Sequence, residues 1–555
     1  MNTQMKTLMS QHIFNSNTCR ILFATCLSAL CLAALSAEAA TITVMNTNDS
    51  GAGSLRAALA SAANGDTIDA TGMSGAILLT SGELFVDKSV TINGPGAANL
   101  AVDGNHSDRV FQVANPVTVT ISGLTITNGS VVSSDVGGGI YNDGSTLTVS
   151  DCAIVANFAS VGGGIYNGHS TLTVSNCTLS GNSAGVGGGI YNAGSNSGSA
   201  TLTINNSTLS GNSAGIGGGG IYNDGIFGGA TLTISNSTLS GNSAGFFAGG
   251  IYNTGEGGSA TLTISNSTLS GNSVSGGVGG GIFNDGRDGS AMLTISNSTL
   301  SGNSAGFFGG IYNYGVSGSA TLTIGDTILN AGASGENIFN NSGTVTSHGY
   351  NLSSDNGGGL LTATGDQINT DPLLGPLQDN GGPTFTHVLL VGSPAIDAGD
   401  PNFNPNSFNP PMVYDQRGPG FNRVVNGRID IGAFEVQAVP SPYAGQVQQP
   451  INADGSSVFS VRRGVVPVKF ILTQGGVATC ALPPATIAVT RTAGGATGAI
   501  DESVYSGSAD AGSNFRIDNC QYVYNLSASA LGVGTYRVDI LIDGQVVGSG
   551  IFQLK

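Results

Sequence analysis

Side chains that could act together as acid and base are sparse in this 555-residue chain. Cleavage of a glycosidic bond usually requires two carboxyl groups roughly 5–10 Å apart. A polysaccharide lyase instead needs a base, commonly Arg or Lys, beside groups that neutralise the substrate's charge. Between Arg109 and Arg417 the single basic residue is Arg287, which lies between Asp285 and Asp288. Lyase chemistry in this region would therefore depend on that one cluster, which is also typical of a solvated loop.

Other acids recur at fixed places in a repeated phrase. Asp143, Asp224 and Asp285 occupy one repeat position, but the repeats between them carry uncharged residues there. Asp151 and Asp326 share a second position, six repeats apart. A catalytic site requires a unique group of acids and bases at one place. We therefore expect no catalytic residues on the repeats, no cofactor, and no enzymatic activity.

A third group of acids lies in an irregular segment rich in Gly and Pro. Its six members could bind Ca²⁺, which takes six to eight oxygen ligands. Alternatively, they cap turns and pair with nearby arginines, which is the interpretation we favour, and we assign no metal ligand. The acids are Asp371, Asp397, Asp400, Asp415, Asp430 and Glu435, and the arginines are Arg417, Arg423 and Arg428.

Four cysteines follow the N-terminal apolar segment. Cys480 and Cys520 are candidates for a disulfide in an oxidising compartment. Cys152 and Cys177 are one 25-residue repeat apart, which places them side by side in neighbouring repeats. A separation of about 4.8 Å between neighbouring strands would permit a disulfide. Stacked free thiols are the alternative for this pair.

The repeats that must position these residues extend from Gly137 to Leu329. An Ile-Tyr-Asn or Ile-Phe-Asn phrase occurs seven times, with successive Asn residues 25, 25, 31, 30, 31 and 29 positions apart. Such a period indicates a solenoid, because one unit cannot bury its apolar face alone. The alternation in Thr231-Leu-Thr-Ile234 is typical of a strand. We predict an all-β chain, with a right-handed parallel β-helix of three strands per coil from about residue 80 to 437.

Stacking of the repeats places equivalent residues in columns. Leu and Ile columns should face inward, and stacked amides should hydrogen-bond along the helix. The predicted structural Asn ladder is Asn142, Asn167, Asn192, Asn223, Asn253, Asn284 and Asn313. The aromatic column from Tyr141 to Tyr312 alternates with Ile, so we expect it to face outward. It would be either a solvated stripe or a surface on which sugars stack.

The flanking segments predict export and a second domain. Ile21–Leu35 is apolar and Ala37-Glu-Ala39 resembles a cleavage site, so residues 1–39 read as a signal peptide. Residues 40–135 would form a cap helix, Ser54–Ala63, and the first coils. Residues 136–345 would be the repeat β-helix, 346–437 the last coils and a cap, and 438–555 a small Ig-like β-sandwich. No later run approaches the about 20 apolar residues of a membrane span.

Several motifs resemble those of secreted bacterial β-helix proteins. Asn46–Arg56 resembles the CSLREA N-terminal domain, and the Gly-Gly-Gly-Ile-Tyr and Leu-Ser-Gly-Asn phrases are similar to repeats of polymorphic outer-membrane proteins. Arg463–Phe470 resembles the PxKF domain. Five further segments together resemble the choice-of-anchor Q region: Asn369–Leu377, Asp379–Thr384, Gly392–Gly399, Asp415–Gly418 and Asp430–Glu435. The resemblance implies export and a β-helix architecture, and it implies no particular reaction.

The charge composition limits the classes of molecule that this chain can bind. The net charge of −17 and the scarcity of basic residues make nucleic acid an unsuitable ligand. We expect a secreted or cell-surface protein that acts as an adhesin-like or structural molecule, with a surface glycan or a host or matrix molecule as its partner. The sequence identifies no anchoring partner. The alternative is a carbohydrate-active β-helix protein of the lyase or glycoside hydrolase type.

Overall fold

A computed structural model describes residues 39–131, 135–437, 443–462, 464–474, 476–494, 508–542 and 545–555. All but the last residue of the predicted signal peptide lies outside the described residues. The chain divides into two compact units, residues 1–437 and 438–555, which we describe separately. No described helix is long and apolar enough to cross a membrane.

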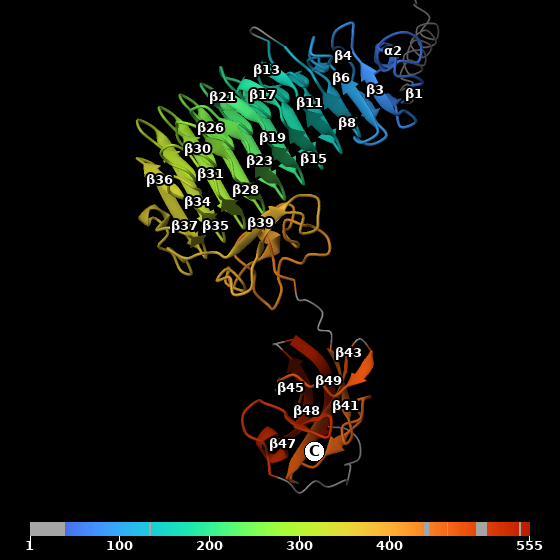
Figure 1. The fold of residues 1–555 in the computed structure, drawn as a ribbon, viewed down its shortest axis with the longest axis vertical. Helices are drawn as coiled ribbons and strands as arrows, with labels where there is room; N and C mark the ends of the chain where they lie inside the picture. Colours follow the sequence, from blue (N-terminus) through green and yellow to red (C-terminus); the bar gives the residue numbers. More distant parts are fainter. Residues whose placement is uncertain are drawn as a thin grey trace, which may run out of the picture. The chain divides into compact units, whose positions relative to one another are not determined.

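The first unit is a parallel β-helix in which each coil adds one strand to each of three long sheets (Figure 1). Sheet A contains β1 (Thr41–Thr43), β2 (Thr67–Asp69), β5 (Thr91–Asn93), β8 (Thr118–Ser122), β11 (Thr146–Ser150), β15 (Thr171–Ser175), β19 (Ser199–Asn205), β23 (Gly229–Ser235), β27 (Ser259–Ser265), β31 (Ser290–Ser296), β34 (Ser319–Gly325) and β37 (Thr344–Gly349). Sheet B contains β3 (Gly75–Leu78), β6 (Leu100–Asp103), β9 (Thr125–Thr127), β12 (Ala153–Val155), β16 (Thr178–Ser180), β20 (Thr208–Ser210), β24 (Thr238–Ser240), β28 (Thr268–Ser270), β32 (Thr299–Ser301), β35 (Ile328–Asn330) and β38 (Leu352–Ser353).

Sheet C carries the Ile-Tyr-Asn phrase, and a short fourth sheet, sheet D, joins sheet B to sheet C. Sheet C contains β4 (Leu84–Val86), β7 (Phe111–Val113), β10 (Ile140–Asp143), β14 (Ile165–Gly168), β18 (Ile190–Ala193), β22 (Ile221–Asp224), β26 (Ile251–Thr254), β30 (Ile282–Asp285), β33 (Ile311–Tyr314) and β36 (Ile338–Asn341). Sheet D contains β13 (Phe158–Val161), β17 (Ser183–Val186), β21 (Ser213–Gly217), β25 (Ser243–Ala244) and β29 (Ser273–Val274). The prediction of three strands per coil is therefore wrong for the five coils that contain a sheet D strand.

The predicted apolar columns are confirmed. Leu232 pairs with Leu262 and Ile234 with Ile264 in adjacent strands of sheet A, and all four side chains are fully buried. Alternate residues of a strand point to opposite faces, so the Thr residues between them face outward. One continuous apolar core extends through the coils from Val44. Burial of each Leu or Ile side chain contributes about 1.5–3 kcal/mol.

The N-terminal end of the β-helix is covered by the α-helix α2 (Leu55–Ser61), as the sequence predicts. The hydroxyl of Ser54 caps it by accepting a hydrogen bond from the Ala57 amide at 3.1 Å. Leu55, Ala58 and Leu59 are buried against the first coils. Because β1 and β2 already belong to sheet A, the β-helix begins near residue 41, well before the predicted start near residue 80.

The C-terminal part of this unit does not continue the β-helix to residue 437, which corrects the sequence prediction. After β38 and η1 (Gly357–Gly359), the chain forms a hairpin of β39 (Leu374–Gln378) and β40 (Thr386–Leu389), then η2 (Pro405–Ser407). Residues 368–437, here called the return segment, fold back along the outside of sheet B (Figure 1). Thr268 Oγ1 donates to Gln416 Oε1 at 2.6 Å, and the Ala433 amide donates to Thr299 Oγ1 at 3.1 Å.

The second unit is a β-sandwich of two mainly antiparallel sheets. The first contains β41 (Tyr443–Gln448), β43 (Val465–Gln474), β44 (Val477–Thr479), β46 (Arg516–Asp518) and β47 (Gln521–Ser527). The second contains β42 (Val458–Phe459), β45 (Ala485–Ala493), β48 (Gly534–Ile542) and β49 (Gln545–Leu554), and α3 (Ala528–Leu531) follows β47. Phe470, Tyr522 and Phe552 are fully buried in one apolar cluster. The predicted fold class, a right-handed parallel β-helix followed by a β-sandwich, is confirmed.

Candidate functional site

The aromatic residues of sheet C form a continuous ladder. In each Ile-Tyr-Asn phrase the Ile and Asn side chains point into the coil, so the ring between them points outward. Parallel pairing in register brings each ring beside the next. Ring centroids are 5.5 Å apart for Tyr141 and Tyr166, and 4.9 Å apart for Tyr252 and Phe283. Both pairs are stacked nearly parallel, an arrangement that adds to the energy of burial.

The exposure of this ladder changes along the helix. The tyrosines from Tyr141 to Tyr222 are half-buried, whereas Tyr252, Phe283 and Tyr312 are only 5%, 4% and 8% exposed. The ring of Phe247, in the turn before sheet C, lies 5.7 Å from Tyr252 and covers it. The expectation that the whole column faces solvent is therefore wrong for its C-terminal half, where turn residues cover the ladder.

The turns that cover the ladder expose other apolar side chains. Ile216, Phe246 and Phe307 are 50%, 58% and 66% exposed. They belong to equivalent turns: the Phe246 amide donates to Ile216 O at 3.0 Å, and the Phe307 amide donates to Gly277 O at 3.2 Å in the intervening coil. Clustered exposed apolar groups mark interaction sites. We call the ladder and these turn residues the aromatic ridge.

Two buried carboxylates accept hydrogen bonds from the hydroxyl groups of the ladder. Tyr191 Oη donates to Asp224 at 2.5 Å and Tyr252 Oη donates to Asp285 at 2.9 Å. Burial raises the pKa of the Asp224 carboxyl above its ordinary value, and it also raises the pKa of the Tyr252 hydroxyl. Each carboxylate also accepts a turn amide, from Ile226 in the case of Asp224. These two acids therefore fix rings and turns.

The Arg287 cluster is an ion-pair group. Arg287 Nη2 lies 3.0 Å from Asp285 Oδ2 and 3.1 Å from Glu256 Oε2. Asp285 is fully buried, and two carboxylates occupy the guanidinium. No hydrogen bond or ion pair in the described chain joins Asp288 to this group. The sequence interpretation missed Glu256, although it follows Gly255 as Arg287 follows Gly286, at the same turn position one coil earlier.

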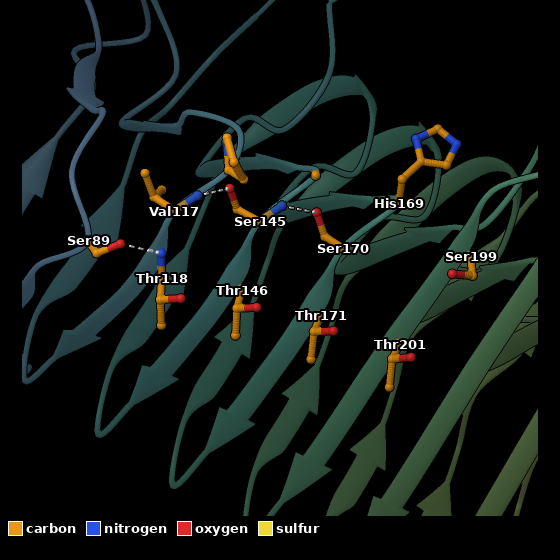
Figure 2. Close-up of a pocket in the computed structure, with 12 residues that line it drawn as sticks. Ser89, Val117, Thr118, Ser145, Thr146, His169, Ser170, Thr171, Ser199 and Thr201 are labelled. Carbon is orange, nitrogen blue, oxygen red and sulfur yellow. Dashed lines mark hydrogen bonds between the residues drawn. The ribbon is translucent and has the colours of Figure 1, made fainter. Parts of the chain in front are cut away.

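A shallow polar hollow of about 360 Å³ lies at the corner between sheets C and A (Figure 2). The hydroxyls of Thr118, Thr146, Thr171 and Thr201 line it, together with His169. The hollow lies where the short turn between β14 and β15 is followed, one coil later, by a longer turn between β18 and β19. Among the described residues, no Lys or Arg lines it.

His169, which the sequence interpretation missed, is held at the edge of this hollow. Its Nδ1 lies 3.2 Å from Asp143 Oδ1 and its Nε2 lies 3.0 Å from Ser195 O. The Ser195 carbonyl and the Asp143 carboxylate raise its pKa, although partial burial opposes them. Both ring nitrogens of His169 thus contact acceptors. This arrangement favours a role as a fixed hydrogen-bond donor over a role as a general base. The sequence did offer a signal for this contact: Asp143 stands one repeat before Gly168, which directly precedes His169, so stacking of the coils brings the two side chains close together.

The Asn ladder lies inside the coils. Asn142 Nδ2 donates to Asn167 Oδ1 at 2.7 Å, and Asn167 Nδ2 donates to Asn192 Oδ1 at 2.8 Å. The same contacts continue through the other four members: Asn223, Asn253, Asn284 and Asn313. All seven side chains are fully buried. The structure thus gives them a structural role and leaves none at the surface.

The four described cysteines separate into two pairs. Cys480 and Cys520 form a disulfide in the β-sandwich, with Cα atoms 5.0 Å apart. Cys152 and Cys177 are buried and unbonded. The Cys152 amide donates to Cys177 Sγ at 3.4 Å, and the Cys177 amide donates to Ser207 Oγ at 3.1 Å. These thiols therefore occupy an internal column that the next four coils fill with serine: Ser207, Ser237, Ser267 and Ser298.

The acids of the return segment accept backbone amides, in several cases from one another, and Asp415 pairs with an arginine. Arg417 Nη2 lies 2.6 Å from Asp415 Oδ2, and its guanidinium lies over the rings of Phe421 and Phe434, 3.9 and 3.7 Å from their centroids. Asp430 accepts two backbone amides. One of these amides belongs to Asp397, and Asp371 and Asp400 accept turn amides from Leu373 and Asn402. Within the described ranges no three acids, cysteines or histidines converge as metal ligands.

Glu435 is the most perturbed acid of the return segment. It is fully buried and accepts the amides of Val425 and Asp430. Burial raises the pKa of its carboxyl to about 8, and the attraction of Arg423 only partly opposes this effect. Arg423 is itself fully buried and donates to two backbone carbonyls. This pair belongs to the core that holds the return segment against the β-helix.

Comparisons of the chain with protein-family models, with curated proteins and with solved structures give no match.

Proposed function

We propose that this chain is a secreted or cell-surface protein that binds an extended ligand without chemically changing it, in the manner of an adhesin. The observation that carries the proposal is the aromatic ridge. Its ladder repeats one ring per coil, and Ile216, Phe246 and Phe307 extend from it into solvent. A row of equivalent contacts suits a ligand with its own repeat, such as a glycan or a fibrous matrix molecule.

Energetics favour binding by many weak contacts. Coils are spaced by about 4.8 Å, so neighbouring contacts on one ligand act at high effective concentration. The exposed rings supply apolar area, and aromatic side chains dominate the binding energy of many interfaces. Because Phe247 and Phe308 pack on Tyr252 and Tyr312, the ridge is rigid before it binds. Rigidity reduces the entropy lost on association.

The charged groups give no support to a catalytic alternative. Arg287 is engaged by two carboxylates, and both ring nitrogens of His169 have acceptors. A glycoside hydrolase requires a proton donor and a second carboxylate across the scissile bond. Hydroxyls border the hollow, and Asp143 contacts it only through His169.

Export is supported by two independent features. The apolar segment Ile21–Leu35, followed by Ala37-Glu-Ala39, is typical of a secretory signal. The Cys480–Cys520 disulfide suits an oxidising compartment. Proteomic detection of the chain in culture medium or on intact cells, beginning near residue 40, tests this part of the proposal.

The binding proposal is tested with the full chain on a glycan array and on a panel of matrix proteins. Replacement of both Phe246 and Phe307 by Ser should weaken capture, because it removes the two most exposed rings of the ridge and leaves the other contacts in place. Val391→Ser, which removes a 99% exposed apolar side chain from the return segment, is the matched control and should bind normally. Equal binding by both variants would contradict the proposal.

Deletion of one complete coil, residues 231–260, provides a second measurement. An extended site should lose affinity gradually with each coil removed. Release of cleavage products from a bound glycan, abolished by His169→Ala or Arg287→Ala, would instead establish the carbohydrate-active alternative.

A further inference from the structure

A second surface of the β-helix, separate from the aromatic ridge, is unusually regular. The outward face of sheet A carries one threonine on every one of its twelve strands, and parallel pairing in register aligns these threonines into a single central column. Its members are Thr41, Thr67, Thr91, Thr120, Thr148, Thr173, Thr203, Thr233, Thr263, Thr294, Thr323 and Thr346.

A second threonine column runs beside the first, two residues earlier on each strand. It extends from Thr118 on β8 to Thr344 on β37 and is interrupted only once, by Met292 on β31. Figure 2 shows Thr118, Thr146 and Thr171 of this column side by side on successive strands. The two columns form a lattice with repeats of about 4.8 Å across the strands and roughly 6.6 Å along them.

Figure 2 shows Thr118, Thr146, Thr171 and Thr201 in the same orientation on successive strands. Threonine is β-branched and restricted at χ1, and the neighbouring strands restrict it further. Thr148, Thr173 and Thr203 are half-exposed, and Thr146 and Thr171 are exposed. None of these five hydroxyls has a hydrogen-bond partner within the described part of the chain. The face therefore presents rows of fixed, unpaired hydroxyls alternating with methyl groups.

The chemistry of this face excludes most macromolecular ligands. The eight strands of sheet A from β8 to β34 contain no charged and no aromatic residue. A polyanion would find no cation there, and a sugar would find no ring on which to stack. Sheet B differs, because the return segment covers its C-terminal strands through Thr238, Thr268 and Thr299.

We propose that the threonine face of sheet A binds the surface of an ice crystal. An uncharged lattice that repeats in two directions matches a ligand with a two-dimensional repeat of its own. In ice the oxygen atoms also form a lattice with two repeats, and the shorter repeat is close to the separation of neighbouring strands. Hydroxyls that lack a protein partner hold ordered waters with little loss of enthalpy, and the methyl groups between them favour an ordered water layer. Each contact is weak, but a rigid array of many contacts binds firmly.

The test is ice-affinity partition of the full chain, combined with the gap between its melting and freezing temperatures. The wild-type chain should enter growing ice and open this gap. Thr203→Tyr with Thr233→Tyr places two bulky side chains in the centre of the lattice and should reduce both signals to those of an unrelated protein. Thr178→Tyr, at an exposed position on sheet B, is the matched control and should retain both.

A gain-of-function variant makes the test sharper. Met292→Thr fills the single gap in the second column, so the temperature gap should widen relative to wild type. Circular dichroism and thermal unfolding establish that each variant is folded. Exclusion of the wild-type chain from ice would overturn the proposal, as would equal ice activity in the double tyrosine variant. Capture by crystalline cellulose or chitin through the same face, without ice activity, would also overturn it. Because the face and the ridge differ, failure here leaves the ridge tests unaffected.

Discussion

Replacement of Asn242 by Ala should open the β-helix locally at a second internal amide column, distinct from the Asn ladder of sheet C. This column is formed by Asn157, Asn182, Asn212, Asn242, Asn272 and Asn303. Asn242 Oδ1 accepts hydrogen bonds from the Asn212 amide at 3.0 Å and from Asn212 Nδ2 at 2.9 Å. Its own Nδ2 donates to Leu209 O at 3.0 Å and to Asn272 Oδ1 at 2.9 Å. The side chain is fully buried, so water cannot replace these contacts. Alanine would therefore leave three hydrogen-bonding positions empty: the Asn212 amide, the Nδ2 hydrogen of Asn212 that does not bond Leu179 O, and the position on Leu209 O that Asn242 Nδ2 occupied.

The magnitude follows from the cost of an unsatisfied buried polar group, about 1–3 kcal/mol each. Three such groups lower the local free energy of opening by at least about 3 kcal/mol. Coils of a solenoid open in local units, so hydrogen exchange resolved by peptide is the suitable assay. Protection in β20 and β24 should fall by about 100-fold, because each factor of ten corresponds to about 1.4 kcal/mol.

The matched control is Asn406→Ala, the same substitution at an exposed position of the return segment. It should change stability by less than about 0.5 kcal/mol. If Asn242→Ala lost no more protection than this control, the amide column would not hold the coils together and the reasoning would be refuted.

Three further predictions concern the core, the sandwich and the return segment. Leu232→Ala should cost about 2–5 kcal/mol by urea unfolding, because it leaves a cavity in a fully buried column; a loss below about 0.5 kcal/mol, the size expected of a surface substitution, would contradict it. Reduction of the Cys480–Cys520 bond, which closes a 40-residue loop, should destabilise the β-sandwich by about 4 kcal/mol in calorimetry and leave the β-helix transition unchanged. Glu435 holds its proton more tightly in the folded chain, with a pKa of about 8 against an ordinary 4.5, so stability should fall as the pH rises between these values. Limited proteolysis of the return segment should therefore be faster at the upper end of this range, and Glu435→Gln should remove that dependence.

The period of the repeats made most of the β-helix predictable. Once Leu232 is one period from Leu262, stacking requires that both lie in one column, and the alternation along the strand decides which residues face inward. The amide column followed from the same argument. Sheet D was missed because strands such as Ser243–Ala244 are too short to show an alternation of their own.

The docking of the return segment and the burial of the C-terminal rings could not be predicted, because the contacts that produce them leave no pattern in the nearby sequence. Gln416 binds Thr268, which is 148 positions away, and nothing near either residue indicates the pairing. The burial of Tyr252 depends on the conformation of the turn at Phe247. Glycine allows the backbone of such a turn many conformations, so the sequence does not specify which one forms. Long-range docking and turn geometry therefore required the structure.

The regular register of sheet A has a consequence for how this protein can vary. Each coil from β19 to β34 presents the same pattern of side chains to both of its neighbours, so insertion or loss of a whole coil joins compatible edges. The cap at α2 and the return segment contact only particular coils. In-frame duplication or deletion of about 30 residues would thus change the reach of the array without creating a new interface, and natural variants are expected to differ in coil number more readily than in coil shape.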